Sequence, residues 1–208
     1  MARLPGITAS QGGLRVKLAY FFTERVLAKL AGRAPKEAVT ALGMYAYLPG
    51  VLTAYGRLEQ ATNKLDLIDN RIRYLAELKA ATMTACEYCM DLGSQIARRA
   101  GLSDEKLLAM PNYRTSDVFT EQEKLVMDYA AGMCRTPAEV PDEVFARLRQ
   151  QFSDAQIVEL THVIALENMR GRFNRALDIG SAGYSEGLVC VVPAAAAAPG
   201  PGVAGTQG

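Results

Sequence analysis

Residues 82–94 read Thr-Met-Thr-Ala-Cys-Glu-Tyr-Cys-Met-Asp-Leu-Gly-Ser, and this stretch joins two segments whose apolar residues have helical spacing. Two residues separate Cys86 from Cys89, at the expected start of the second helix. Two thiols at this spacing can close a disulfide in place. The positive end of the helix dipole would also favour a thiolate, which is the nucleophilic form. The stretch therefore predicts a dithiol redox centre.

Two simpler uses of the cysteine pair compete with this interpretation. A structural zinc site needs four ligands, and the other candidates, Cys134, Cys190 and His162, each stand alone in the sequence. The pair could also be two buried, unreactive thiols, because free cysteine is a common small core residue. We prefer the redox interpretation to both and predict no metal site.

Size and composition restrict the class of protein. The chain has 208 residues, half of them hydrophobic, which is enough for one domain with its own core. A net charge of +1 argues against a nucleic-acid partner. No apolar run is long enough to cross a bilayer, and the N-terminus lacks the pattern of a secretory signal. We therefore expect a cytoplasmic protein without a membrane partner. No P-loop or dinucleotide glycine fingerprint is present, and we predict no cofactor.

The apolar residues around the cysteine pair return at intervals of three and four, and no convincing alternating strand appears. Pro49 should start a new helix or kink an old one. Asp66 or Asp69 can cap the helix that leads to the cysteines. Residues 120–123 and 153–156 have the pattern of capping boxes, the second for a long helix that reaches about residue 178. These signals predict an all-α fold with the cysteine pair at the N-terminus of a central helix.

The chain divides into three parts by composition. Residues 1–13 contain several glycines and a proline and are expected to form a flexible arm. Residues 14–192 carry the helical patterns and form the predicted domain. Residues 193–208 consist mainly of Ala, Pro and Gly, cannot bury enough apolar surface to offset chain entropy, and are expected to be a disordered tail.

The sequence also resembles a known family. Residues 75–107, with Ala-Cys-Glu-Tyr-Cys at 85–89 and Ala-Gly-Leu-Ser-Asp-Glu at 100–105, are similar to the carboxymuconolactone decarboxylase/AhpD-like alkylhydroperoxidase family. The resemblance extends more loosely over about residues 47–177. It implies an AhpD-like helical subunit that forms a homo-oligomer (trimer, hexamer or dimer). It also implies a hydroperoxide substrate and a dithiol or a thioredoxin- or lipoyl-type protein as reductant.

The resemblance assigns roles to the two thiols. Cys89 would attack the peroxide and become a sulfenic acid, and Cys86 would resolve it as a disulfide that the reductant then opens. The family motif ordinarily has a His four residues after the second cysteine and a Glu twelve residues before the first. This chain has Gly93 and Tyr74 at those positions. Glu77, one helical turn from Tyr74, could present a carboxylate to the same pocket.

The catalytic candidates are therefore Cys89, Cys86, Glu77 and Tyr74. For Glu77 the alternative is an ordinary surface carboxylate, and for Tyr74 a half-buried core tyrosine whose hydroxyl has no chemical role. Asp91 should point away from Cys89 and complement the N-terminus of its own helix.

Other reactive or charged side chains have simpler explanations. We interpret His162 as structural and Cys134 as a core residue, while Cys190 could meet the active site of the same or another subunit. Three arginines on the last long helix could bind an anionic group or form a solvated face: Arg170, Arg172 and Arg175.

Three functions from different classes follow. We rank first a thiol-dependent peroxidase or disulfide oxidoreductase built on Cys86 and Cys89. The second is a weakened paralogue with an assembly or stress-related role, which the missing His and Glu favour. The third is a non-redox enzyme of the carboxymuconolactone decarboxylase type, which the retained cysteines and the missing His both oppose.

Overall fold

The computed structural model describes residues 2–35 and 40–193, and within them all regular secondary structure is helical. The elements in chain order are α1 (Leu14–Ala31), α2 (Thr40–Tyr45), α3 (Pro49–Thr62), α4 (Asn70–Met83), α5 (Glu87–Arg99), α6 (Asp104–Ala109), the 3-10 turn η1 (Met110–Asn112), α7 (Glu121–Met133), α8 (Asp142–Gln151) and α9 (Asp154–Ala176). The all-α prediction is confirmed. The predicted tail begins at the last described residue, so residues 194–208 lie outside the described part.

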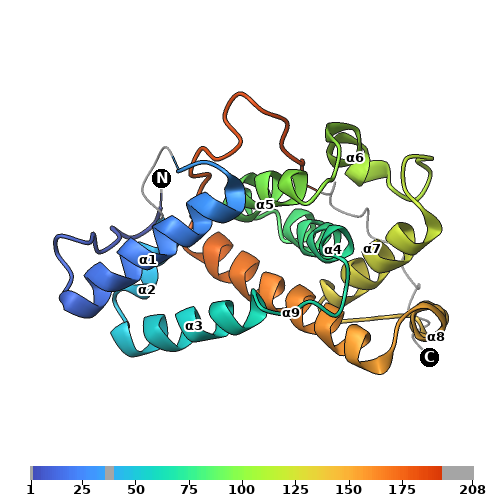
Figure 1. The fold of residues 1–208 in the computed structure, drawn as a ribbon, viewed down its shortest axis with the longest axis horizontal. Helices are drawn as coiled ribbons and strands as arrows, with labels where there is room; N and C mark the ends of the chain where they lie inside the picture. Colours follow the sequence, from blue (N-terminus) through green and yellow to red (C-terminus); the bar gives the residue numbers. More distant parts are fainter. Residues whose placement is uncertain (1, 36–39, 194–208) are drawn as a thin grey trace, which may run out of the picture.

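Helix α4 is the centre of the fold, with α5, α7 and α9 packed against it (Figure 1). Its apolar residues divide between two sides. Leu75 and Leu78 join a cluster that includes α1, α5 and both cysteines, whereas Ala76 and Ala80 join a second cluster with α7 and α9. Because both sides of α4 are covered, this helix is almost wholly buried, and it fixes the position of the turn that follows it.

The local signals act as predicted at most helix ends. Pro49 is the first residue of α3, where its missing N–H costs nothing. The Asp69 side chain accepts a hydrogen bond from the backbone N–H of Arg71 and caps α4. Thr120 with Glu123, and Ser153 with Gln156, form complete capping boxes at the starts of α7 and α9.

The segment before α1 contains no helix, yet it is held to the helical body. The backbone N–H of Ile7 donates to the carbonyl of Gly43, and the Tyr20 hydroxyl donates to the carbonyl of Ile7 at 2.6 Å. The Tyr47 hydroxyl donates to the carbonyl of Pro5 at 2.6 Å. These contacts join the segment before α1 to α1 and to residues 43–47, and the flexibility of the segment stays a prediction.

Residues 177–193 return over α5 (Figure 1), and Asp91 fixes them there. The buried Asp91 carboxylate accepts hydrogen bonds from the backbone N–H groups of Ala182, Tyr184 and Ser185. The prediction that Asp91 serves the N-terminus of its own helix was therefore wrong. Its partners lie on a distant segment that the helical pattern could not identify. Among the described residues, no helix has the length and apolar character needed to cross a membrane.

Candidate functional site

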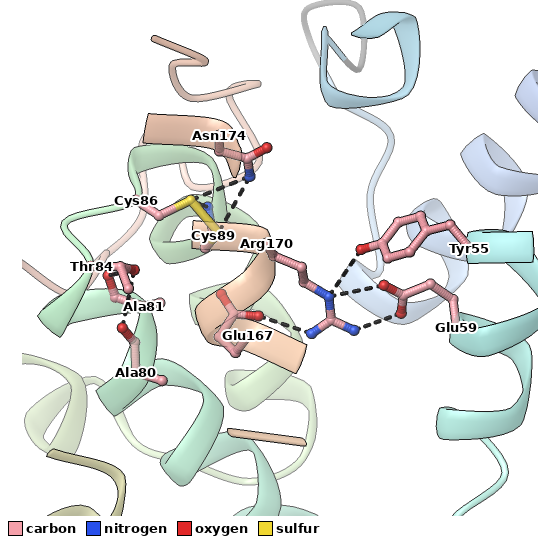
Figure 2. Close-up of a disulfide and its surroundings, with 10 residues drawn as sticks. All are labelled: Tyr55, Glu59, Ala80, Ala81, Thr84, Cys86, Cys89, Glu167, Arg170 and Asn174. Carbon is pink, nitrogen blue, oxygen red and sulfur yellow. Dashed lines mark hydrogen bonds and ion pairs between the residues drawn. A yellow bond between two sulfur atoms is a disulfide. The ribbon is translucent and has the colours of Figure 1, made fainter. Parts of the chain in front are cut away.

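The two cysteines form a disulfide at the junction of α4 and α5, with a Cα–Cα distance of 5.2 Å (Figure 2). Helix α4 ends in a Schellman motif, in which the N–H of Cys86 donates to the carbonyl of Ala81 and the N–H of Ala85 to that of Thr82. Ala85 takes the left-handed conformation that this motif needs, with φ of 50°. Cys86 then caps α5, because its sulfur accepts the N–H of Cys89 at 3.2 Å. The predicted CxxC pair at a helix N-terminus is confirmed.

A close approach of α9 to α4 completes the surroundings of the disulfide. Gly171 of α9 faces Thr84, and a Cβ at this position would lie 2.7 Å from the Cβ of Thr84. The Thr84 hydroxyl donates to the carbonyls of Ala80 and Ala81 (Figure 2), which holds the side chain in this contact. Only a residue without a side chain fits here, and the contact brings the next turn of α9 to the sulfurs.

That next turn carries Asn174, whose buried side-chain amide lies against both sulfurs. Its Nδ2 donates to the Sγ of Cys86 at 3.4 Å and to the Sγ of Cys89 at 3.5 Å. A hydrogen bond to a sulfur is stronger when that sulfur is a thiolate, because the acceptor then carries a charge. Asn174 is thus placed to stabilise the reduced, ionised form of the pair.

The two sulfurs differ in access. Cys86 is fully buried, with 0% of its surface exposed, whereas Cys89 is 8% exposed and lines a cavity of about 830 Å³. Helices α1, α2, α3, α4, α5 and α9 contribute side chains to this cavity. Its α1 wall is apolar and includes Leu18, Phe22 and Val26. A molecule in the cavity can therefore meet Cys89, while Cys86 lies behind it.

The inner wall of the cavity carries charges centred on Arg170 (Figure 2). Its guanidinium donates to Glu59 at 2.6 and 2.9 Å, to Glu167 at 2.9 Å and to the Tyr55 hydroxyl at 3.3 Å. Burial acts to raise the pKa of Glu59, but the charge and hydrogen bonds of Arg170 outweigh it, so the pKa is below its usual value. For Glu167 burial dominates over Arg170 and raises the pKa to about 7.

Two of the sequence-based candidates, Glu77 and Tyr74, line the same cavity as Cys89. Glu77 forms an ion pair with the buried Arg73, with an Oε1–Nε distance of 3.1 Å. The Arg73 guanidinium also lies over the Tyr74 ring, 5.5 Å from its centroid. Burial raises the pKa of Tyr74, and the nearby Glu77 carboxylate adds to this effect. The structure thus brings these residues to the site, and their catalytic roles stay predictions.

Gly93, which stands where the family motif has a His, is also part of the cavity wall. A Cβ on this residue would lie 3.0 Å from Cδ2 of Leu78. Backbone atoms therefore form the cavity wall at position 93, and this position supplies no imidazole to Cys89.

The remaining candidates lie elsewhere. The Nε2 of His162 is 2.8 Å from the hydroxyl of Thr62, consistent with a structural role. Cys134 accepts a hydrogen bond from the Asn168 amide at 3.1 Å, and burial raises the pKa of its thiol. Cys190 lies against Ser94, with an Oγ–Sγ distance of 3.6 Å.

The three arginines of α9 do not form one site. Arg170 faces the cavity, Arg172 donates to the Thr136 hydroxyl at 2.7 Å, and Arg175 is exposed. Among residues 2–35 and 40–193, no cluster of His, Cys, Asp and Glu side chains has a geometry that could hold a metal ion.

Sequence reasoning did not identify Asn174, Glu167 or the Arg170–Glu59 pair as parts of the site. One signal was available, since positions 167, 170 and 174 are polar and lie three and four residues apart on a helix with apolar neighbours. The spacing places them on one face, but it does not reveal that this face is turned towards the cysteines.

Comparison with known proteins agrees with this geometry. The model of the carboxymuconolactone decarboxylase family matches residues 49–132. The protein YnjA of Escherichia coli (strain K12) is 37% identical over 139 residues, which is 66% of this chain and 71% of the relative.

Two solved structures have the same fold. The debrominase Bmp8 has a TM-score of 0.72 at 21% identity, over 86% of this chain and 91% of that one. An alkylhydroperoxidase AhpD core protein from Ralstonia eutropha JMP134, described as peroxidase-related, has a TM-score of 0.67 at 18% identity, over 86% and 92%. By its sequence matches, its helical fold and its CxxC pair, this chain belongs to the carboxymuconolactone decarboxylase family and has the AhpD-like architecture.

Proposed function

We propose that this protein is a thiol-dependent peroxidase that reduces hydroperoxides through Cys89 and Cys86. One observation carries the proposal: the two sulfurs are within bonding distance, and one of them opens onto a large cavity while the other is sealed. Such an arrangement separates the two thiols by role. The exposed thiol meets the substrate, and the buried thiol meets only its neighbour.

The reaction begins with the reduced pair. The Cys89 thiolate attacks the terminal oxygen of ROOH, so that an S–O bond forms, the O–O bond breaks and RO⁻ leaves as ROH after protonation. The Cys86 thiol then attacks the sulfenic sulfur, which forms the disulfide and releases water. A dithiol reductant attacks the disulfide and is itself oxidised, which restores both thiols.

Each surrounding group supports one part of this cycle. Asn174 and the N-terminus of α5 favour the thiolate of Cys89. Glu77 and Tyr74 are the sequence-based candidates for proton transfer from the cavity wall. The proposal includes a homo-oligomer in the cytoplasm and a reductant of the thioredoxin or lipoyl type, as the family resemblance implies.

A second candidate function is reductive dehalogenation. The debrominase Bmp8 has this fold, and a variant of it was solved with 2,3,4-tribromopyrrole. The size of the cavity and its apolar, aromatic wall favour a bulky ring over a small peroxide. In such a reaction the pair would supply two electrons, a C–H bond would replace the C–halogen bond, and halide and the disulfide would be the products.

Thiol counting after exposure to substrate tests both candidates. The wild type, Cys86→Ser and Cys89→Ser are reduced, freed of reductant and treated with one equivalent of cumene hydroperoxide. We expect the wild type to lose two thiols to an internal disulfide. In Cys86→Ser a sulfenic acid on Cys89 should be trapped by dimedone, and Cys89→Ser should consume no peroxide. Cys134→Ser is the matched control, because Cys134 lies outside the cavity, and it should behave like the wild type.

Equal peroxide consumption by all these proteins would remove the peroxidase proposal. Bromide release from tribromopyrrole that requires Cys89, with no reaction towards peroxide, would favour the second candidate. A pair that remains reduced under both treatments would favour the weakened paralogue.

A further inference from the structure

The inner wall of the cavity holds more negative than positive charge. Five charged side chains there are buried or half-buried, whereas Arg15 and Arg57 at its rim are exposed. The inner five are Glu59, Glu77, Glu167, Arg73 and Arg170. Three carboxylates therefore share two guanidiniums, and ionisation of the nearby Cys89 adds a further negative charge. One of the three carboxylates must therefore have less positive charge and fewer hydrogen-bond donors next to it than the other two.

The contacts identify Glu167 as that carboxylate. Arg73 is paired with Glu77, and Arg170 donates two hydrogen bonds to Glu59 but one to Glu167. Only Oε2 of Glu167 receives that bond, while its Oε1 is buried without a hydrogen-bond partner. The side chain is 8% exposed. A proton on Glu167 relieves the cost of this unpartnered, charged oxygen.

We propose that Glu167 is the proton acceptor of the dithiol site and takes the place of the relay His and Glu that this chain lacks. The inference rests on the proposed peroxidase function. The Glu167 carboxylate takes the proton from the Cys89 thiol, and the thiolate then attacks the peroxide. The protonated Glu167 returns the proton to the departing RO⁻, which leaves as ROH, so the carboxylate is regenerated in the same half-reaction.

The path of the proton follows from the placement of Glu167 on α9. Glu167 lies seven residues from Asn174, which touches the sulfurs, and this corresponds to about 10 Å along the helix axis. No hydrogen bond joins Glu167 to Cys89 among the described contacts, so the proposed transfer runs through water in the cavity that both side chains line.

The other groups near Glu167 determine how it titrates. Burial raises the pKa of Glu167, and Arg170 on the same helix acts to lower it. The carboxylates of Glu77 on α4 and Glu59 on α3 act to raise it further. Besides the exposed Arg15 and Arg57, the titratable and charged side chains that line the cavity with Glu167 and Arg170 are Tyr45 from α2, Tyr55 and Glu59 from α3, Arg73, Tyr74 and Glu77 from α4, and Tyr88 and Cys89 from α5. Cys134, at the end of α7, also interacts electrostatically with Glu167. With burial dominant, Glu167 titrates in the neutral range, where an acceptor that must also donate is most effective.

The test compares three glutamates. Glu167→Gln keeps the size of the side chain and removes its proton chemistry, and Glu77→Gln does the same for the sequence-based candidate. Glu159→Gln is the matched control: Glu159 lies on the same helix, is buried and also has an unpartnered Oε1, but it is bound to the backbone N–H of Leu67. The rate of oxidation by cumene hydroperoxide and the rate of alkylation of Cys89 by iodoacetamide are measured on the reduced proteins across pH.

We expect the wild type and Glu159→Gln to show two ionisations in both rates, one from Cys89 itself and one from Glu167. In Glu167→Gln only the ionisation of Cys89 should remain, and the peroxide rate at neutral pH should fall by about 100-fold. Glu167→Asp keeps a carboxyl group and should retain both ionisations, and it replaces the Gln variant in the test if that variant does not fold. Profiles of Glu167→Gln that superimpose on those of the wild type, or loss of the second ionisation in Glu77→Gln instead, overturn the inference. If the wild type does not react with peroxide, the proposed function fails, and the alkylation profiles still decide the role of Glu167.

Discussion

Asn174→Ala should make Cys89 less acidic in the reduced protein. The substitution removes the amide that lies 3.5 Å from the Sγ of Cys89 and leaves the backbone of α9 unchanged. One hydrogen bond to a charged acceptor contributes about 1.5–3 kcal/mol, which corresponds to a rise of about 1–2 in the pKa of Cys89. The fraction of thiolate at neutral pH, and with it the rate of reaction with peroxide, should fall by about 10-fold or more.

The assay is the pH dependence of iodoacetamide alkylation, with modification of the Cys89 peptide followed by mass spectrometry. Asn168→Ala is the matched control, since Asn168 lies on the same helix and donates to Cys134 in the same way, at 3.1 Å. It should shift the titration of Cys134 and leave that of Cys89 unchanged. An alkylation profile of Cys89 in Asn174→Ala that superimposes on that of the wild type would show that the amide does not stabilise the thiolate.

Three further predictions concern stability and are measured by urea unfolding. Folding raises the pKa of Glu167 from 4.5 to about 7, so the wild type loses stability as pH rises through this range. The free energy of unfolding of Glu167→Gln, relative to that of the wild type, should therefore increase by about 3 kcal/mol between about pH 4 and pH 8. A difference between the two proteins that does not change with pH would contradict this. Asp91→Asn should lose about 3 kcal/mol because one charged acceptor of three backbone N–H groups is lost, and an unchanged midpoint would refute that anchoring role. Gly171→Ala should lose about 2 kcal/mol through the clash with Thr84, and Thr84→Ala should restore part of it if the contact is the cause.

The parts of the fold that depend on neighbouring residues were predictable from the sequence. The helical periods, the start of α3 at Pro49, the cap at Asp69 and the two capping boxes all result from contacts within a few residues. The position of the cysteine pair at a helix start is of the same kind. Such signals need no knowledge of how the helices pack.

The composition of the site depended on packing and was only partly predictable. Asn174 reaches the sulfurs because Gly171 lets α9 approach α4, and nothing in the sequence near residue 171 names Thr84 as its neighbour. Arg170 and Glu59 come from distant helices and pair only in the folded chain. Asp91 was misassigned for the same reason, since the N–H groups it binds belong to a segment about ninety residues further along the chain.

The unequal access of the two sulfurs has a kinetic consequence. Because Cys86 is sealed and Cys89 faces the cavity, hydroperoxide and reductant must both reach the cysteine pair on the side of Cys89, the first when the pair is reduced and the second when it is a disulfide. The proposed peroxidase reaction should therefore obey a ping-pong rate law, with parallel lines in double-reciprocal plots. Excess hydroperoxide should inhibit competitively with respect to the reductant. An unreactive molecule that occupies the cavity should inhibit both the oxidation and the reduction of the cysteine pair.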